Sequence, residues 1–475
     1  MVPRGRRHVV ALVLLLAGCS SVDDAATSSG ARNGTVATTL TTVPGPALTL
    51  PPAPPFRSGP VEPAVAEVLP LVVSSLRNGA LDARVVAAVG ASRDGRLGWI
   101  LSDLMRLSGG DDEKALATAF SQVTGAGLQD ASSDGNAWQV ATDLLIAWDT
   151  PAPDGYQSFK AELFLALEPR WRPIFEDASA DIDWRFLSWG GVLIDDRPLG
   201  DTDACIRGCI PALDDPPLTS AADGDWYPDD RLVFGITLGG EAVALPKNMM
   251  EVHEMVNLTI AGRRVAVPYC TLCGSAEAFF TDRVKGAERA LVVRTSGLLY
   301  LSNKVMYDLD SSSAFDTFNG RAVSGPLHRA GTTLPMLTVV TSTWGRWRAE
   351  HPTTRIIARD GGLGRDYELD PLGGRDANGP IFPIRRADTR LPVHTQVLGV
   401  VAADGTAVAF PVDAARAAIQ AGRSVKMRGV MVVADGGGLR ATVADADVAT
   451  HQAFWFAWAQ FHAGTELWQE TSAPS

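Results

Sequence analysis

The C-terminal half of the chain contains an ordered internal repeat. Two apolar runs joined by a Gly-containing turn at residues 233–246 recur at residues 397–411, and the pattern Trp-x2-Trp-x3-His-x2-Thr that begins at Trp344 recurs from Trp455. Paired apolar runs around such a turn are typical of β-hairpins. Two Trp residues three positions apart share one face of a helix and favour core packing. Because both segments recur in the same order, the sequence predicts two related strand-rich modules.

The N-terminus has the features of a lipoprotein export signal. Three arginines among the first seven residues precede an apolar run at residues 9–16, which is too short to span a bilayer. The run ends in Leu16-Ala17-Gly18-Cys19, which resembles the bacterial lipobox, where cleavage before the Cys leaves that residue diacylated. The alternative is an ordinary secretory signal with an incidental Cys. We expect a protein on the extracytoplasmic face of the cell envelope, held to the membrane by a lipid at Cys19.

Composition and periodicity divide the remainder of the chain. Residues 20–60 are rich in Ser, Thr, Ala, Pro and Gly, which predicts a tether, and apolar residues at three- and four-residue spacing predict helices over 62–175. The expected segments are a signal peptide at 1–18, a tether at 19–61, a helical region at 62–175, a connector with Cys205 and Cys209 at 176–229, a strand-rich module at 230–396 and a shorter related module at 397–470. We therefore expect an α+β fold, in which a helical N-terminal region precedes a strand-rich, mostly antiparallel domain with an internal duplication.

Charge excludes one class of partner. The chain carries a formal net charge of −12 and has no run of Lys or Arg. Proteins that bind nucleic acid present a basic patch or stripe, so we expect no nucleic-acid partner. The sequence does not indicate which substrate or redox partner the protein has.

Cys270 and Cys273 form a Cys-x-x-Cys motif that the shorter module lacks. This spacing brings two sulfur atoms close enough for a disulfide, so that one thiol can attack a substrate and the other can resolve the mixed disulfide. The same spacing supplies half of a tetrahedral zinc site, and a purely structural disulfide is the third alternative. The spacing alone leaves all three open.

His253 begins the motif His-Glu-Met-Val-Asn, which the shorter module also lacks. In the zinc-peptidase motif His-Glu-x-x-His the fifth residue is a His, but Asn257 stands there in this chain, and Asn is a poor zinc ligand. We therefore reject a metallopeptidase. Three roles remain for His253: deprotonation of a thiol, metal binding or a local hydrogen bond.

Cys205 and Cys209 lie just before the strand-rich region. They can form their own disulfide, pair with Cys270 and Cys273, or complete a four-Cys zinc site, and sequence does not choose among these pairings. An exported protein meets an oxidising environment, which favours a disulfide over zinc.

Several motifs together resemble one known family. The stretch from about Trp189 to Pro411 is similar to the domain of unknown function 3179 family of exported bacterial and archaeal proteins. The motifs that carry the resemblance are Ile210-Pro211-Ala212-Leu213, His253-Glu254-Met255-Val256-Asn257, Tyr269-Cys270-Thr271-Leu272-Cys273-Gly274, Ser296-Gly297-Leu298-Leu299-Tyr300, Asn303-Lys304-Val305-Met306-Tyr307-Asp308, Gly325-Pro326-Leu327, and Trp344 with His351-Pro352.

The resemblance implies no established activity. The family commonly has Pro after the first Cys of the motif, where this chain has Thr271, so the turn can differ while both sulfur atoms are kept. Some relatives are selenoproteins, and where selenocysteine replaces a Cys of this motif the resemblance favours redox work at Cys270 and Cys273, because selenium usually serves as a nucleophile.

These observations leave three hypotheses. The first is a lipoprotein with thiol–disulfide oxidoreductase-like activity that needs no cofactor, in which Cys270 or Cys273 is the nucleophile and His253 is the nearby base. The second is an envelope protein that binds zinc or copper through Cys270, Cys273 and His253. The third is a non-enzymatic binding or structural lipoprotein with stabilising disulfides. Further candidates for lining the site are Glu254, Asn257, Tyr269, Ser296, Tyr300, Asn303 and Tyr307.

Overall fold

A computed structural model describes residues 51–77, 80–128, 136–203, 205–374 and 380–470. Everything below concerns these described residues. The predicted signal peptide at 1–18, the lipidation site Cys19 and most of the predicted tether lie outside the described residues. Within the described part, no helix has the length and apolar character needed to cross a membrane.

Short helices follow one another from residue 63 to residue 175. Their ends follow from local sequence: Asp82 caps one helix by accepting a hydrogen bond from the backbone of Arg84, and Gly125, with φ +77°, ends another in the left-handed conformation that Gly adopts readily. The α-helices are α1 (Pro63–Val68), α2 (Leu71–Arg77), α3 (Ala83–Ser92), α4 (Gly98–Leu107), α5 (Gly110–Thr124), α7 (Ala137–Ala147), α8 (Tyr156–Leu167) and α9 (Arg172–Phe175), and the 3-10 helices are η1 (Gly95–Leu97), η2 (Pro169–Trp171) and η3 (Trp184–Phe186).

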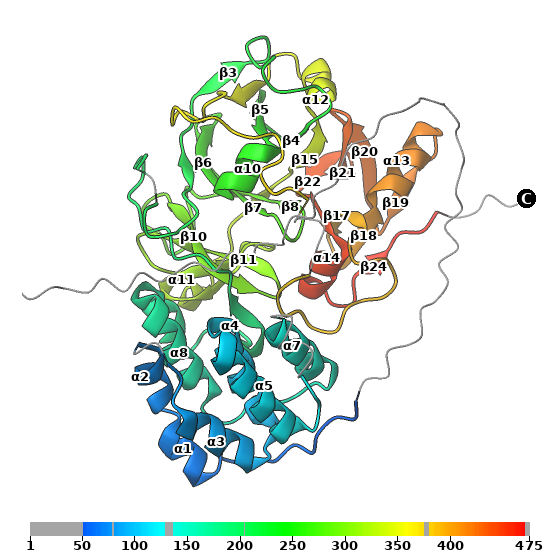
Figure 1. Cartoon of the computed structure of the whole chain (residues 1–475). Coiled ribbons are helices and arrows are strands. Elements are labelled where there is room, and N and C mark those ends of the chain that lie inside the picture. The colour runs from blue at the N-terminus through cyan, green and yellow to red at the C-terminus, as the bar shows by residue number, and fades with distance from the viewer. Residues whose placement is uncertain (1–50, 78–79, 129–135, 204, 375–379, 471–475) are drawn as a thin grey trace, which may run out of the picture. The chain divides into compact units, whose positions relative to one another are not determined.

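The strands of the described residues form five small sheets, which are the blades of a β-propeller (Figure 1). Sheet 1 contains β1 (Leu187–Trp189), β10 (Val293–Tyr300), β11 (Asn303–Asp308), β12 (Ala314–Asp316) and β13 (Ala322–Ser324). Sheet 2 contains β14 (Met336–Leu337), β9 (Ala278–Phe280), β7 (Arg263–Cys270), β6 (Met255–Ile260) and β2 (Leu213–Asp214), and β8 (Ser275–Ala276) pairs with β7.

The remaining three sheets contain strands from residues 218–357 and 396–467. Sheet 3 contains β15 (Val340–Thr343), β4 (Leu232–Leu238), β5 (Glu241–Pro246), β16 (Arg355–Ile357) and β3 (Leu218–Ser220); sheet 4 contains β23 (His451–Phe454), β17 (Gln396–Val401), β18 (Ala407–Pro411) and β24 (Glu466–Leu467); sheet 5 contains β19 (Val425–Met427), β20 (Val430–Asp435), β21 (Gly438–Val443) and β22 (Ala446–Val448). Helices between strands are α10 (Lys247–His253), α11 (Pro326–Arg329), α12 (Trp344–Glu350), α13 (Val412–Gln420) and α14 (Trp455–Phe461).

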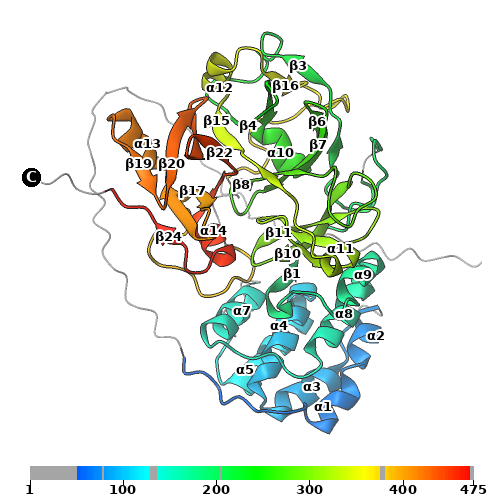
Figure 2. The ribbon, with the colours of Figure 1, turned by 180° about the vertical axis from the view of Figure 1, so that it is seen from behind.

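The N-terminal helices share one hydrophobic core with sheet 1. Buried side chains of the helices form a continuous cluster with Leu298, Val305 and Val323 of the sheet. The indole Nε1 of Trp171, which is fully buried, donates a hydrogen bond of 2.7 Å to the carbonyl oxygen of Ser296 on β10. In both views the helical part lies next to β10 and β11, and Figure 2 shows β1 on the side that faces α4. The helices therefore cover a blade of the propeller.

The predicted fold class, α+β with a helical N-terminal region followed by a duplicated, mostly antiparallel strand-rich domain, is wrong. The strands form five separate small sheets in a propeller, and the helices share their core with one of those sheets. Sequence repetition identified only the two segments that resemble each other closely. The other sheets carry no recognisable copy of that pattern, so the sequence did not reveal that they are units of the same architecture.

The repeated Trp pattern belongs to sheets 3 and 4 and has the same structure in both. The indole Nε1 of Trp347 donates to Thr354 Oγ1, and that of Trp458 donates to Thr465 Oγ1, both at 2.9 Å. Each of these indoles also lies against a Gly of the neighbouring strand, where a Cβ atom would overlap the ring. A hydrogen bond between indole and hydroxyl seven residues apart explains the conserved spacing within the chain, and the contact with Gly explains why both strands contain one.

We predict that Gly399→Ala destabilises the protein by about 1–3 kcal/mol, because the added methyl group overlaps the buried ring of Trp458 and overpacked cores cost that much. Val401→Ala, which changes a half-exposed side chain on the same strand, is the matched control. Chemical denaturation measures both. Equal stability of the two variants would show that the Trp458–Gly399 contact does not constrain the sheet.

Candidate functional site

Cys270 and Cys273 lie at the two ends of a tight turn between β7 and β8. Both are free thiols, exposed by only 2% and 0%, and their Sγ atoms are 3.0 Å apart. The backbone N–H of Cys273 donates to the carbonyl oxygen of Cys270 at 3.2 Å, and Gly274 has φ +57°. A disulfide needs an S–S distance of about 2.05 Å, so a small movement of two side chains would join these sulfur atoms. Thr271, where the family commonly has Pro, is accommodated in this turn.

Glu254 and Lys304 lie beside the thiol pair. The Lys304 ammonium forms an ion pair with the Glu254 carboxylate and also donates to the Glu254 carbonyl oxygen at 3.1 Å. That carbonyl oxygen accepts a second hydrogen bond, of 3.0 Å, from the backbone N–H of Tyr269. Glu254 has φ +53° because α10 ends there. One residue of the HExxN motif thereby connects the strand that carries Cys270 to the strand that carries Lys304.

The two thiols have different acidities. Burial and the negative charge of Glu254 oppose ionisation of Cys270. Hydrogen bonds from Cys273 and from the backbone N–H of Lys304, with a smaller contribution from the Lys304 charge, outweigh them and lower the pKa of Cys270 below its ordinary value. For Cys273, burial and the neighbouring Cys270 raise the pKa well above the ordinary value. Only a thiolate is a strong nucleophile, so Cys270 is the more reactive sulfur of the pair.

A pocket of about 380 Å³ opens onto Cys270. Its polar lining comprises Cys270, Lys304, the two acidic residues Glu251 and Glu254, and Thr271 and Thr295, while Cys273 is not among its lining residues. The remaining wall is largely apolar and includes Val192, Ile210, Leu272, Leu298, Leu299 and Phe382. The pocket thus exposes the more acidic sulfur to a small molecule and leaves the second sulfur behind it.

His253 has a local role in the structure. Its side chain is fully buried; its Nδ1 donates to the carbonyl oxygen of Pro211 at 2.6 Å, and its Nε2 lies 2.7 Å from the hydroxyl of Tyr367. Burial lowers the pKa of His253 to about 4, so the ring is neutral near pH 7. Because Nδ1 donates, Nε2 accepts from Tyr367. Both nitrogens are therefore occupied away from the thiols, and His253 does not line the pocket at Cys270.

The structure places two further predicted site residues in structural contacts. The side-chain amide of Asn257 donates to Asp214 and to the carbonyl oxygen of Val293, each at 3.0 Å. Tyr269 is buried, with its ring centroid 4.9 Å from that of Phe234. These two side chains hold neighbouring strands together and do not reach the Cys270 pocket.

The predicted residues on β10 and β11 also lie outside the lining of the Cys270 pocket. The Ser296 hydroxyl donates to the carbonyl oxygen of Val305, and the Tyr307 hydroxyl donates to that of Asp195 at 2.6 Å. The Tyr300 hydroxyl lies 3.4 Å from an Arg385 nitrogen, and Asn303 is fully buried. Of the seven additional candidates, the structure brings only Glu254 to the pocket.

Lys304 is the functional residue that sequence reasoning missed. It lies on β11, in which every residue is buried, and its own side chain is only 3% exposed. A Lys is almost never buried unless it is paired. However, β11 also contains Asn303 and Asp308, so the sequence of this strand does not reveal that Lys304 is buried. Its partner Glu254 is 50 residues away in the chain, and no local pattern connects the two.

Cys205 and Cys209 form a disulfide with each other, which selects one of the pairings that the sequence left open. Among the described residues, the only group of three or more His, Cys, Asp or Glu side chains within 4.8 Å of one another is Asp195, Cys205 and Cys209. Its two sulfur atoms are engaged in the disulfide. The Asp195 carboxylate accepts hydrogen bonds from Arg197 and from the backbone of Ala212. The proposed metal-ligand set of Cys270, Cys273 and His253 does not form such a group.

Comparison with known families gives one match. Residues 207–446, about half of the chain, match the family model described as "Protein of unknown function (DUF3179)". This match contains both the HExxN and the CxxC motifs, and the resemblance predicted from them is confirmed. No curated protein and no solved structure was found to match the chain.

We predict that Lys304→Met raises the pKa of Cys270, because the variant removes the ammonium that stabilises the thiolate. A rise of about one pKa unit would slow alkylation of Cys270 by iodoacetamide roughly tenfold at pH values below that pKa. Mass spectrometry of the modified protein measures the rate at Cys270. Lys285→Met, which removes an exposed Lys elsewhere, is the control, and an unchanged rate in Lys304→Met would show that Lys304 does not activate Cys270.

The depressed pKa of His253 has a consequence for stability. Between about pH 6.5 and about pH 4 the unfolded chain binds a proton at His253 that the folded chain does not, so acid lowers the free energy of unfolding. We expect the stability difference between the wild type and His253→Gln to decrease by up to about 3 kcal/mol over this window. Urea denaturation at several pH values measures it. A difference that is constant from pH 7 to pH 4 would contradict the buried, neutral assignment.

Proposed function

The chain belongs to the DUF3179 family of proteins of unknown function, and we propose that it is a thiol–disulfide oxidoreductase in which Cys270 attacks and Cys273 resolves. The observation that carries this proposal is that two free thiols lie 3.0 Å apart and that, of the two, only Cys270 lines a pocket. A structural disulfide needs no pocket. A redox pair needs one sulfur that a substrate can reach and a second sulfur close behind it.

The reaction follows from these positions. The Cys270 thiolate attacks one sulfur of a substrate disulfide, which forms a mixed disulfide and releases the other substrate sulfur as a thiolate that takes up a proton. The Cys273 thiol then loses its proton and attacks Cys270 Sγ, so that the Cys270–Cys273 disulfide forms and the second substrate sulfur leaves as a thiol. The substrate gains two electrons and the pair loses two. The reverse sequence, with a dithiol substrate, restores the two protein thiols.

Lys304 and Glu254 support this chemistry in different ways. The Lys304 ammonium and backbone N–H favour the thiolate form of Cys270. Glu254 fixes Lys304 through the ion pair and the carbonyl hydrogen bond, so Glu254 is a positioning residue. We assign no proton transfer to His253, because Pro211 and Tyr367 occupy both of its nitrogens.

We also propose that the protein works on the extracytoplasmic face of the membrane, anchored by a lipid at Cys19. The arginines, the short apolar run and the residues before Cys19 support export. The disulfide between Cys205 and Cys209 also supports it, because disulfides persist in oxidising compartments. A dithiol pair in that environment must be able to exchange with other thiols, which the exposure of Cys270 to a pocket permits.

An aromatic disulfide reagent that releases a coloured thiolate tests the roles of the two sulfur atoms. With wild type in which Cys270 and Cys273 are thiols, the Cys205–Cys209 disulfide is kept and Cys19 is lipidated or removed, we expect release of two thiolates and formation of the Cys270–Cys273 disulfide. Cys273→Ser should release one thiolate and retain the other half of the reagent on Cys270, which intact mass spectrometry detects. Cys270→Ser should react at least about tenfold more slowly, because Cys273 is buried and its pKa is raised.

The double variant Cys205→Ser/Cys209→Ser is the matched control, since it removes the other pair of cysteines and leaves the pocket residues in place. It should still release two thiolates. Equal reaction rates in the wild type and Cys270→Ser, or release of both thiolates by Cys273→Ser, would refute the proposed roles.

A further inference from the structure

A second pocket lies on the other side of the CxxC turn. It measures about 610 Å³ and is lined by residues of sheets 3 and 4, of α10, α12 and α13, and of the loops that precede β17 and β21. The predicted site residue Tyr269, on β7 of sheet 2, also lines this pocket. Gly274, directly after Cys273, lines this pocket, whereas Cys270 and Thr271 line the first one. The CxxC turn therefore contributes residues to both pockets, but the two pockets have no lining residue in common.

The second pocket is cationic in an acidic protein. Lys247, Arg346 and Arg416 line it, and Asp413 is the only acidic side chain that does so. The chain as a whole has 54 acidic and 42 basic residues. The pocket lining is therefore positively charged in a protein whose net charge is negative. Within the described part of the chain, Lys247 is paired with Glu251, whereas no ion pair is formed by Arg346 or Arg416. A concave site lined by one sign of charge concentrates ions of the opposite sign.

Buried polar atoms at this pocket also lack partners. The Nε of Arg416, the side-chain nitrogen of Gln452 and the side-chain oxygen of Gln396 are each buried without a hydrogen bond among the described residues. Gln452 is only 5% exposed. Buried donors are nearly always satisfied in native proteins. Two of these three atoms are donors, and an anionic oxygen is the acceptor that suits them.

The rest of the wall suits the organic part of a ligand. Phe234 and Phe454 provide aromatic surface. Thr341 and Thr343 line the pocket from β15, the strand that directly precedes α12 in the sequence. Gly274 keeps the pocket open at the turn, since a Cβ there would lie 2.9 Å from the Phe454 ring and from the Gln396 amide. Ligand sites commonly combine an apolar wall with a few polar groups that orient the ligand.

We propose that this pocket binds a small organic anion, whose carboxylate or phosphate group is held by Arg416, Arg346 and Gln452 and whose apolar part lies against Phe234 and Phe454. The site stands apart from the thiol chemistry, because none of these residues lines the Cys270 pocket. A carboxylate and a phosphate present the same anionic oxygens to the arginines, and their different charge allows an experiment to separate them.

Calorimetric titration of the purified protein with phenyl phosphate, benzoate and neutral benzamide tests the proposal. We expect one of the two anions to bind at least tenfold more tightly than benzamide; tighter binding of phenyl phosphate identifies a phosphate site, and tighter binding of benzoate identifies a carboxylate site. Arg416→Gln should weaken binding of that anion at least tenfold. Cys270→Ser should bind it as the wild type does, so a failure of the redox proposal leaves this result unaffected.

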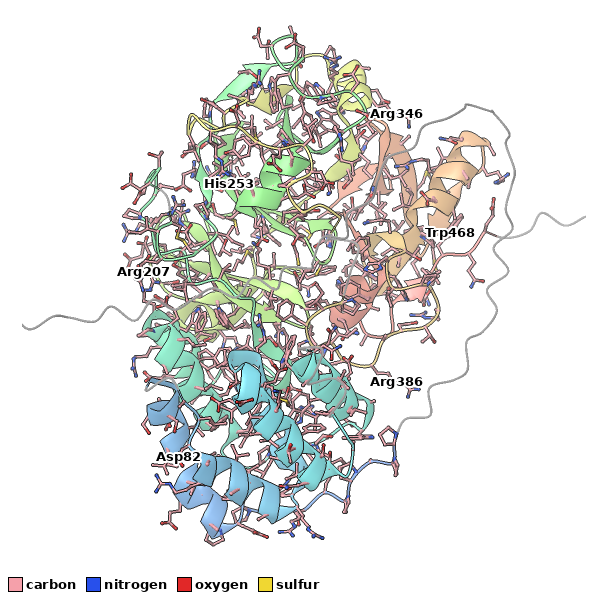
Figure 3. The ribbon with its side chains drawn as sticks, in the orientation of Figure 1. Asp82, Arg207, His253, Arg346, Arg386 and Trp468 are labelled. Atoms are coloured by element: carbon pink, nitrogen blue, oxygen red, sulfur yellow. A yellow bond between two sulfur atoms is a disulfide. The ribbon has the colours of Figure 1, made fainter. Side chains whose placement is uncertain are left out.

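Arg386→Gln is the matched control, because it removes the same charge at an exposed position that does not line the pocket and that lies well apart from Arg346 (Figure 3). It should leave binding unchanged. If Arg416→Gln does not fold, Arg346→Gln, whose side chain is exposed, gives the same test. The proposal is overturned if neither anion binds, if benzamide binds equally, or if the pocket variant that folds binds the anion as tightly as Arg386→Gln does.

Discussion

The carbonyl oxygen of Glu254 accepts two hydrogen bonds, one from the backbone N–H of Tyr269 and one from the Lys304 ammonium. The arrangement of the thiol site depends on these two bonds. The first bond fixes the end of β7, where the turn with Cys270 begins. The second brings a buried cation from sheet 1 to the same place. A buried Lys requires a partner, so the ion pair with the Glu254 carboxylate and the carbonyl bond together stabilise the cation there. Cys270 then lies beside this ion pair, with its sulfur largely buried.

The sequence predicted the local elements of the fold better than their arrangement. The repeated Trp–Trp–His–Thr pattern does form equivalent structures, because the indole bonds a hydroxyl seven residues later and that contact is local. The propeller could not be predicted, since four of the five sheets combine strands that are distant in the chain, and only sheet 5 is built from consecutive strands. Sheet 3, for example, pairs β3 with β16, and strands β10 to β13 of sheet 1 lie between these two strands in the sequence. The helices were predicted as a separate region because the contact of Trp171 with Ser296 leaves no trace in local periodicity.

The residues of the candidate site, too, could be predicted from the sequence only where the contact between them is local. The CxxC motif was identified because its two sulfur atoms are brought together by a single turn, and the structure places them 3.0 Å apart. His253 was expected near them because the HExxN motif is close in sequence. However, α10 ends at His253 and the left-handed conformation of Glu254 changes the direction of the chain, so that Glu254 lines the thiol pocket and His253 contacts Tyr367. Tyr367 carried no sequence signal at all.

The reduction potential of the Cys270–Cys273 pair tests the central claim most directly. The protein would be equilibrated in glutathione buffers of graded potential, and the fraction of free thiol at the two positions would be measured by alkylation and mass spectrometry. A pair that exchanges with substrates should interconvert reversibly between dithiol and disulfide at a potential above about −300 mV, because structural disulfides lie below that value. A pair that never forms a disulfide, or one that remains oxidised below about −300 mV, would contradict a redox function for this pocket.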